Sequence, residues 1–198
     1  MGTRGTIPEA VHLYVLPALV QAAEILDERR YADFARRSRD LYLAESNLVD
    51  FAQPAMLSHF FCYIQEALID LGAAEVASRG MASLAEYQRP NFAVPAHHDV
   101  KWICTPGQIQ AAICWFKLGD RERGGQTLDF IEQFRNPSGG YYGSYGVDAG
   151  YFPAEEISWA TKFRLDATWL RDVQPPAPEI APIPLAKAKT LDGWVPAE

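Results

Sequence analysis

The stretch KLGDRERGGQTLDFIEQFRNPS, residues 117–138, is the third copy of a pattern that recurs along the chain. Two earlier stretches align with it: ILDERRYADFARRSRDLYLAES at 25–46 and DLGAAEVASRGMASLAEYQRPN at 70–91. The aligned leucines follow one another at intervals of 45, 47 and 47 residues, at Leu26, Leu71, Leu118 and Leu165. A nearly fixed period of this length is typical of proteins built from repeated helical units.

Each repeat predicts a pair of helices, because apolar residues recur every three or four positions on both sides of the aligned leucine. Gly72 and Gly119 follow two of the first helices, at the position where helices often end in a left-handed residue. The first helices are expected at 7–26, 55–71, 106–118 and 154–170, and the second helices at 29–45, 73–88 and 121–135. The expected fold class is all-α, with about three and a half repeated helical hairpins.

The fourth repeat stops after its first helix. Six prolines stand between Pro175 and Pro196, and proline at this density excludes a helix and favours extended structure. We therefore expect one hairpin-repeat domain at 1–172 and a proline-rich extended tail at 173–198.

Composition excludes several classes of function. The chain has 198 residues, of which 48% are hydrophobic, and 18 basic against 25 acidic residues give a net charge of −7. It has no basic cluster for a nucleic acid and no apolar stretch of the roughly 18 residues that a membrane span needs. The odd number of cysteines indicates buried thiols in a reducing, cytoplasmic setting, at Cys62, Cys104 and Cys114.

The connections between hairpins are long, whereas the turns inside hairpins are short. The long connectors cover 47–56, 89–106 and 136–154, and they are rich in aromatic, histidine and acidic residues. In stacked helical pairs all connections of one kind emerge on the same side. We expect the three connectors to gather at one end of the domain, where long loops on a rigid scaffold often bind ligands.

The third repeat resembles the one found in the α/α-toroid group, which includes terpenoid cyclases, protein prenyltransferases and six-hairpin glycosidase-like enzymes. The residues that carry the resemblance are a basic and a small residue, an aliphatic residue, a glutamine and a Gly-x-aromatic triplet, here Arg123-Gly124, Leu128, Gln133 and Gly139-Gly140-Tyr141. The second repeat matches the first half of the pattern, with Arg79-Gly80, Leu84 and Gln88.

This resemblance implies a ring of inner helices around a central cavity, with the ligand held at one mouth. Complete members of the group have more hairpins than this chain, so the expected structure is a partial α/α toroid. A partial ring leaves an apolar edge, and a second copy or a partner chain is expected to complete it. An open helical solenoid has nearly the same period and is the alternative architecture.

The third connector contains the densest group of candidate site residues. Tyrosine and tryptophan rings offer flat faces for stacking on a sugar, and the candidates are Tyr141, Tyr142, Tyr145, Tyr151 and Trp159. Carboxylates that could act as general acid or base are Glu155 and Glu156, with Asp148 as a neighbour. Glu155 and Glu156 are expected to begin the helix at 154–170, and Glu155 would share a polar face with Trp159, Lys162 and Asp166. The alternative is a purely structural role, in which the two carboxylates only complement the helix dipole.

The second connector holds His97, His98 and Asp99, which could form a secondary proton-transfer pair. Trp102 and His59 are further candidates for contact with the ligand. Cys104 precedes the start of a predicted helix, a position that lowers the pKa of a thiol. Histidine, aspartate and cysteine can bind zinc, but no pair here has a recognised ligand spacing, so we expect neither a metal nor another cofactor.

Three functions are consistent with the sequence. The first is a carbohydrate-handling domain that binds an oligosaccharide or small molecule, with acid/base chemistry of the hydrolase or lyase type. The second is a non-catalytic helical module that binds a partner chain. The third is a cyclase or transferase acting on isoprenoids. The residues alone leave open whether the chain is an enzyme.

Overall fold

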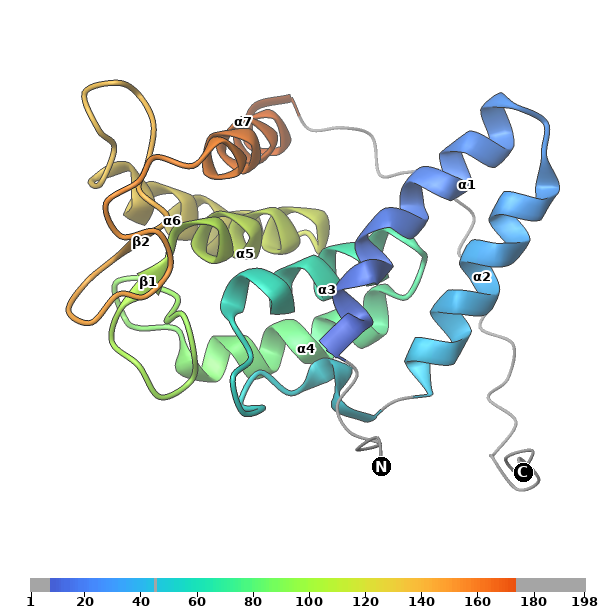
Figure 1. Cartoon of the computed structure of the whole chain (residues 1–198), viewed down its shortest axis with the longest axis horizontal. Coiled ribbons are helices and arrows are strands. Elements are labelled where there is room, and N and C mark those ends of the chain that lie inside the picture. The colour runs from blue at the N-terminus through green and yellow to red at the C-terminus, as the bar shows by residue number, and fades with distance from the viewer. Residues whose placement is uncertain (1–7, 45, 174–198) are drawn as a thin grey trace.

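The computed structural model describes residues 8–44 and 46–173 (Figure 1). The first helices of the successive hairpins are η1 with α1, then α3, α5 and α7, at Pro8–Val15, Leu16–Ile25, Ser58–Asp70, Thr105–Lys117 and Ser158–Val173. The second helices are α2, α4 and α6, at Arg29–Leu43, Ala74–Tyr87 and Arg121–Glu132. A short helix η2, Ser46–Val49, precedes α3. The expected all-α class with three and a half hairpins is confirmed.

The first helices form one continuous layer. Helix α3 packs against η1 and α5, and α5 packs in turn against α7, while α4 and α6 pair with their own partners. Every residue of α5 from Thr105 to Phe116 is buried, because neighbours cover this helix on several sides. A helix that is buried all round explains why α5 has no strong apolar stripe.

The turns within hairpins behave as expected from their residues. Gly72 and Gly119 adopt φ values of 78° and 88°, in the left-handed region that favours glycine. Asp27 takes the equivalent position in the first hairpin with φ 52°. In Figure 1 these short turns lie at the helix ends that face away from the loops that carry β1 and β2.

The second long connector contacts both the first and the third, which brings the three together at one end as predicted. The amide of Ser58, the first residue of α3 after the first connector, donates to the Ala96 carbonyl at 2.7 Å. The second and third connectors form a small antiparallel sheet between β1, Ile103–Cys104, and β2, Ser144–Tyr145. Alternation of polar and apolar residues is too short in either segment to predict these strands.

The start of the last helix corrects one prediction. Helix α7 begins at Ser158 and not at residue 154, so Glu155 and Glu156 lie before it. The backbone there pairs with the third connector instead: Glu156 forms a bridge with Tyr142, and the Ile157 amide donates to the Tyr141 carbonyl at 3.2 Å. Glu155 therefore does not share a helical face with Trp159, Lys162 and Asp166.

The proline-rich tail that was predicted from residue 173 lies outside the described residues, except for Val173, which is the last residue of α7. Among the helices of residues 8–44 and 46–173, none has the length and apolar character of a membrane span. The division into a domain at 1–172 and a tail stays a prediction.

Candidate functional site

The connector end of the domain is built around the first turns of α3 and α5. A Cβ atom at Gly107 would stand 2.2 Å from Ser58 Oγ and 2.7 Å from the His59 backbone nitrogen, so only glycine permits this approach. Thr105 joins the third connector to α5, because its Oγ1 donates to the Tyr142 carbonyl at 2.6 Å. The helix starts and the connectors thus form one rigid unit.

The predicted acidic residues differ in their surroundings. The Glu156 carboxylate accepts hydrogen bonds from Asn136 Nδ2, at 2.8 Å, and from the Ser138 hydroxyl. It thereby fixes the turn at the start of the third connector. Glu155 and Asp148 have exposed side chains, and Asp148 occupies a left-handed turn with φ 60°.

Two of the predicted tyrosines shape the connector itself. Tyr141 is only 1% exposed, and its hydroxyl donates to Glu132 Oε1 at 3.1 Å. Tyr145 stacks on Phe134 with ring centroids 4.6 Å apart, and its hydroxyl donates to the Phe134 carbonyl at 2.9 Å. The structure places these rings in the interior of the loop and leaves Tyr142 exposed.

The histidines of the second connector point to different neighbours. His97 Nδ1 lies 2.8 Å from the Met56 carbonyl, and its ring meets Trp102 edge-on at 5.7 Å. His98 packs edge-on against Tyr87 at 5.9 Å. Trp102 is buried and Asp99 is exposed. These contacts give His97 and Trp102 a packing role in holding the connector against the start of α3.

A group of rings on α3, the third connector and α7 forms what we call the aromatic band, consisting of His59, Tyr63, Tyr151, Phe152, Trp159 and Phe163. The His59 ring lies 4.5 Å from Tyr63, 5.9 Å from Tyr151 and 5.8 Å from Phe163. Phe152 meets both Tyr151, at 5.0 Å, and Trp159, at 5.5 Å. Tyr63, Tyr151 and Trp159 are half-buried and Phe152 is 39% exposed, so the band presents ring faces and edges to solvent.

His59 is the buried end of the band. Its side chain is 3% exposed, and burial lowers the pKa of its imidazole to about 4. Its Nδ1 lies 2.6 Å from Gln110 Oε1 on α5. The imidazole is therefore neutral near pH 7 and retains one nitrogen that can accept a proton.

The Tyr63 ring lies next to this imidazole, and the Tyr14 ring lies next to Tyr63. Tyr14 of η1 meets the Tyr63 ring at 4.3 Å, and burial raises the pKa of Tyr63 to about 12. Burial, followed by the nearby Glu66 carboxylate, raises the pKa of Tyr14 further. Lys162 Nζ donates to the Tyr14 hydroxyl at 3.1 Å. Both phenols are protonated at neutral pH and can donate a proton or a hydrogen bond.

A charged group lies behind the band, between α3 and α5. Lys117 Nζ is 3.1 Å from Glu66 Oε1 and 2.7 Å from Asp70 Oδ2. Burial raises the pKa of Glu66, and the Lys117 ammonium opposes this rise. Burial alone would lower the pKa of Lys117, but the two carboxylates outweigh it and raise the pKa.

Sequence reasoning missed this group, although a signal was present. Glu66 follows His59 by seven residues, and Lys117 follows Gln110 by seven, which places each pair on one face of its helix. Both helices are otherwise mostly apolar, and polar residues at such positions indicate a buried network. His59 was predicted, but without its partners.

The thiols differ from the prediction in one respect. All three cysteines are free and buried, as expected. Burial raises the pKa of Cys104 to about 12, so the lowering that a helix start alone would cause does not prevail. The described residues contain no group of three or more His, Cys, Asp or Glu side chains arranged to hold a metal ion.

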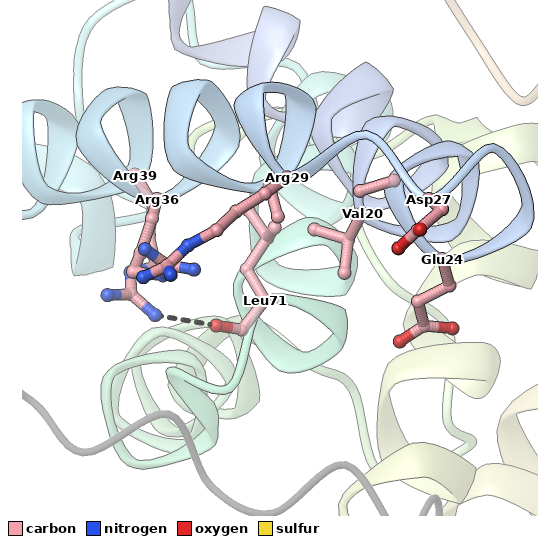
Figure 2. A pocket seen from close by; sticks show the side chains of 9 residues that line it. Val20, Glu24, Asp27, Arg29, Arg36, Arg39 and Leu71 are labelled. Atoms are coloured by element: carbon pink, nitrogen blue, oxygen red, sulfur yellow. Dashed lines mark hydrogen bonds between the residues drawn. The ribbon is translucent and has the colours of Figure 1, made fainter.

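A separate hollow of about 320 Å³ lies between α1, α2 and the end of α3 (Figure 2). Figure 2 shows Arg29, Arg36 and Arg39 of α2 grouped on one side and Glu24 with Asp27 on the other. The arginines already have partners: Arg39 donates to the Leu71 carbonyl at 3.0 Å, and Arg36 pairs with Asp33 at 2.7 Å. Arg29 lies 3.7 Å from the same Asp33. The hollow has no unpaired arginine ready for an anion.

The successive layer of first helices, with second helices outside it and connectors at one end, is the arrangement of a partial α/α toroid. Among solved structures, the chain is similar to the protein named "Polysaccharide Lyase BACCELL_00875", with a TM-score of 0.53 and 13% sequence identity. The match covers 82% of this chain but 59% of that one, so the chain spans less than two thirds of its neighbour. At this identity the likeness shows the fold alone. No protein-family model matches the chain, and no curated protein matches it in sequence.

Proposed function

We propose that this domain binds a polysaccharide along the aromatic band. The observation that carries the proposal is the set of partly exposed rings at the connector end, where Tyr151, Phe152 and Trp159 meet nearly at right angles and Tyr151 also contacts a neutral histidine. Such rings stack on the apolar faces of sugars, and their polar tips bind hydroxyls. The fold shared with a polysaccharide lyase supports this class of ligand over an isoprenoid.

The chemistry that suits the band is proton transfer without a carboxylate pair. Glycoside hydrolysis commonly uses two carboxyl groups on either side of the scissile bond. Here Glu156 is engaged in the connector turn, whereas His59 offers a neutral acceptor nitrogen and Tyr63 offers a protonated hydroxyl. A base that removes a C–H proton and an acid that protonates the departing oxygen would together perform an elimination.

Elimination favours a uronate as the substrate unit, because its carboxyl group acidifies the adjacent C–H. Lys162 supplies a cation at the edge of the band, 4.4 Å from the Phe163 ring centroid. Its ion pair with Asp166 at 2.7 Å is half-exposed, so a sugar carboxylate can compete for the ammonium. We therefore extend the proposal to a polysaccharide that contains uronate.

The test compares two tryptophans of α7. Trp159→Ala removes a ring of the band, and we expect polygalacturonate or alginate to bind about tenfold more weakly in calorimetry, the loss of one aromatic contact. Trp169→Ala removes a ring on the same helix that is 53% exposed and outside the band, and binding should not change. Equal losses in the two variants, or binding by neither the wild type nor the variants, would refute the proposal.

The alternative of a partner chain has one observation in its favour. Leu165, Trp169 and Val173 are exposed at four-residue spacing on α7, the helix whose own hairpin partner is not among the described residues. Such a stripe suits a second copy or another chain that completes the ring. Light scattering of the wild type and of Trp169→Lys tests it: an assembly that the substitution dissolves supports the partner, and a monomer in both cases removes it.

A further inference from the structure

Four polar side chains form a chain of contacts between α3 and α5. It begins at Lys117, which contacts Glu66 at 3.1 Å. Glu66 Oε2 lies 3.4 Å from Gln110 Nε2, and Gln110 Oε1 lies 2.6 Å from His59 Nδ1. Glu66, Gln110 and His59 are all buried, so their hydrogen-bonding groups have few alternative partners.

The charged end of this chain decides how the Gln110 amide is oriented. A carboxylate only accepts hydrogen bonds, while an amide has a donor nitrogen and an acceptor oxygen. Lys117 favours the ionised form of Glu66, which then requires a donor on its other side. The amide NH2 must therefore face Glu66, because a reversed amide would place two acceptor oxygens together.

The orientation of the amide in turn decides which nitrogen of His59 carries the proton. The amide oxygen faces Nδ1, and at 2.6 Å an oxygen acceptor needs a hydrogen on that nitrogen. In a neutral imidazole the second nitrogen, Nε2, then has a free lone pair. The Tyr63, Tyr151 and Phe163 rings surround this imidazole, within 4.5 to 5.9 Å of its centroid.

We propose that Gln110 is a positioning residue that holds His59 in the Nδ1-protonated tautomer and so keeps Nε2 as the proton acceptor of the aromatic band. The role of Nε2 in chemistry rests on the proposed function, but the tautomer itself does not. Lys117 and Glu66 act one step further away, by fixing the amide. Of Lys117, Glu66, Gln110 and His59, only His59 is proposed to touch the substrate.

The tautomer can be read directly from nitrogen NMR of protein labelled at histidine. At pH 7.5 the His59 ring should show a protonated Nδ1 and an unprotonated Nε2. Gln110→Met removes the acceptor, and we expect a mixture of the two tautomers. Gln108→Met is the matched control: Gln108 is also buried on α5, but it bonds to the Val94 amide and the Thr127 carbonyl, so His59 should keep one tautomer.

Turnover of polygalacturonate provides the second measurement. If Gln110 positions the base, Gln110→Met lowers kcat by about tenfold to a hundredfold, within the range for general-base catalysis, while KM stays within about twofold. A wild-type spectrum with the proton on Nε2 overturns the proposal, even if a variant fails to fold. A single Nδ1-protonated tautomer in Gln110→Met also overturns it. If the wild type shows the Nδ1-protonated tautomer but does not bind polygalacturonate, the proposed function is refuted, and the positioning role of Gln110 is retained.

Discussion

Two regions of the molecule hold a buried or largely buried cationic side chain, Arg39 and Lys117, and they do so in different ways. Beside the hollow of Figure 2, Arg39 is 2% exposed and bonds to the Leu71 carbonyl and to Asp40, a residue at the surface. Behind the aromatic band, Lys117 bonds to Glu66 and Asp70. Glu66 contacts the Gln110 amide, and this amide contacts the His59 ring. The first arrangement ends at a main-chain carbonyl at the end of α3 and at a surface carboxylate, whereas the second leads to a titratable group next to solvent-facing rings. A buried charge thus indicates a site only when its partners connect it to one.

Among the substitutions that test this comparison, removal of the Lys117 charge should lower the free energy of unfolding most. Lys117→Met leaves Glu66 buried without its cation, and we expect the free energy of unfolding to fall by about 3 kcal/mol or more. Urea denaturation measures the loss. Lys162→Met breaks an exposed pair with Asp166 and should cost less than about 1 kcal/mol. Similar losses in the two variants would contradict the role of burial.

Acid should weaken the fold through His59. Its folded pKa of about 4 lies below the ordinary value of 6.5, so the unfolded chain binds this proton more readily. The contribution of the neutral imidazole is complete above about pH 6.5, declines as the pH falls towards 4, and amounts to on the order of 3 kcal/mol.

The measurement compares urea midpoints of the wild type and His59→Phe between pH 7 and pH 4. The wild type should lose more stability over this range than the variant. The difference between the curves isolates His59, because Glu66, whose pKa is raised by burial, titrates in both proteins. Parallel curves would exclude a depressed pKa for His59.

Loss of Arg39 should affect stability less than loss of Lys117. Arg39→Met leaves the Leu71 carbonyl at the end of α3 without its donor, at a cost of about 1–3 kcal/mol, but strands no buried carboxylate, since Asp40 reaches water. Arg36→Met, which removes a partly exposed pair from the same helix, should change stability by less than about 1 kcal/mol. Thermal denaturation of both variants decides; a larger loss in Arg39→Met than in Lys117→Met would reverse the comparison.

The close approach of α3 to α5 gives an effect of about the same size as the loss of Arg39. Gly107→Ala places a Cβ atom against Ser58 and the His59 backbone, and the overpacking should cost about 1–3 kcal/mol. In Gly125→Ala on α6 the added Cβ atom meets no neighbouring atom within 4 Å, so the substitution should be neutral or stabilising by up to about 1 kcal/mol. Calorimetric melting temperatures of the two variants would show whether the space around the added methyl group, and not helix propensity, decides the change in stability.

The repeat pattern predicted the helices because it depends on local spacing. The leucines at intervals of about 47 residues and the glycines at the turns require no knowledge of distant contacts. The predicted start of α7 was wrong because it depends on a contact between distant segments. Residues 155–157 pair with the backbone of 141–143, which helical periodicity does not reveal.

The site was predicted less well than the fold. The connector tyrosines look alike in sequence, yet Tyr141 is buried in the core with its hydroxyl bonded to Glu132, whereas Tyr142 is exposed. Tyr151, Trp159 and His59 were identified by residue type and do lie in one band. Gln110, the partner of His59, and Tyr14, which contacts the Tyr63 ring, are brought to the band by packing between α3, α5 and η1, which a single sequence does not specify.

The rates at which the three buried cysteines react with a thiol reagent would report local opening of the fold. Cys62 and Cys114 lie against each other across α3 and α5, with Cys114 Sγ 3.7 Å from the Cys62 carbonyl, while Cys104 sits at the start of α5. Because none reaches solvent in the closed fold, an alkylating reagent can modify them only after these helices part. The order in which the cysteines react would therefore report whether the connector end opens before the middle of the helix pair, without any probe added to the chain.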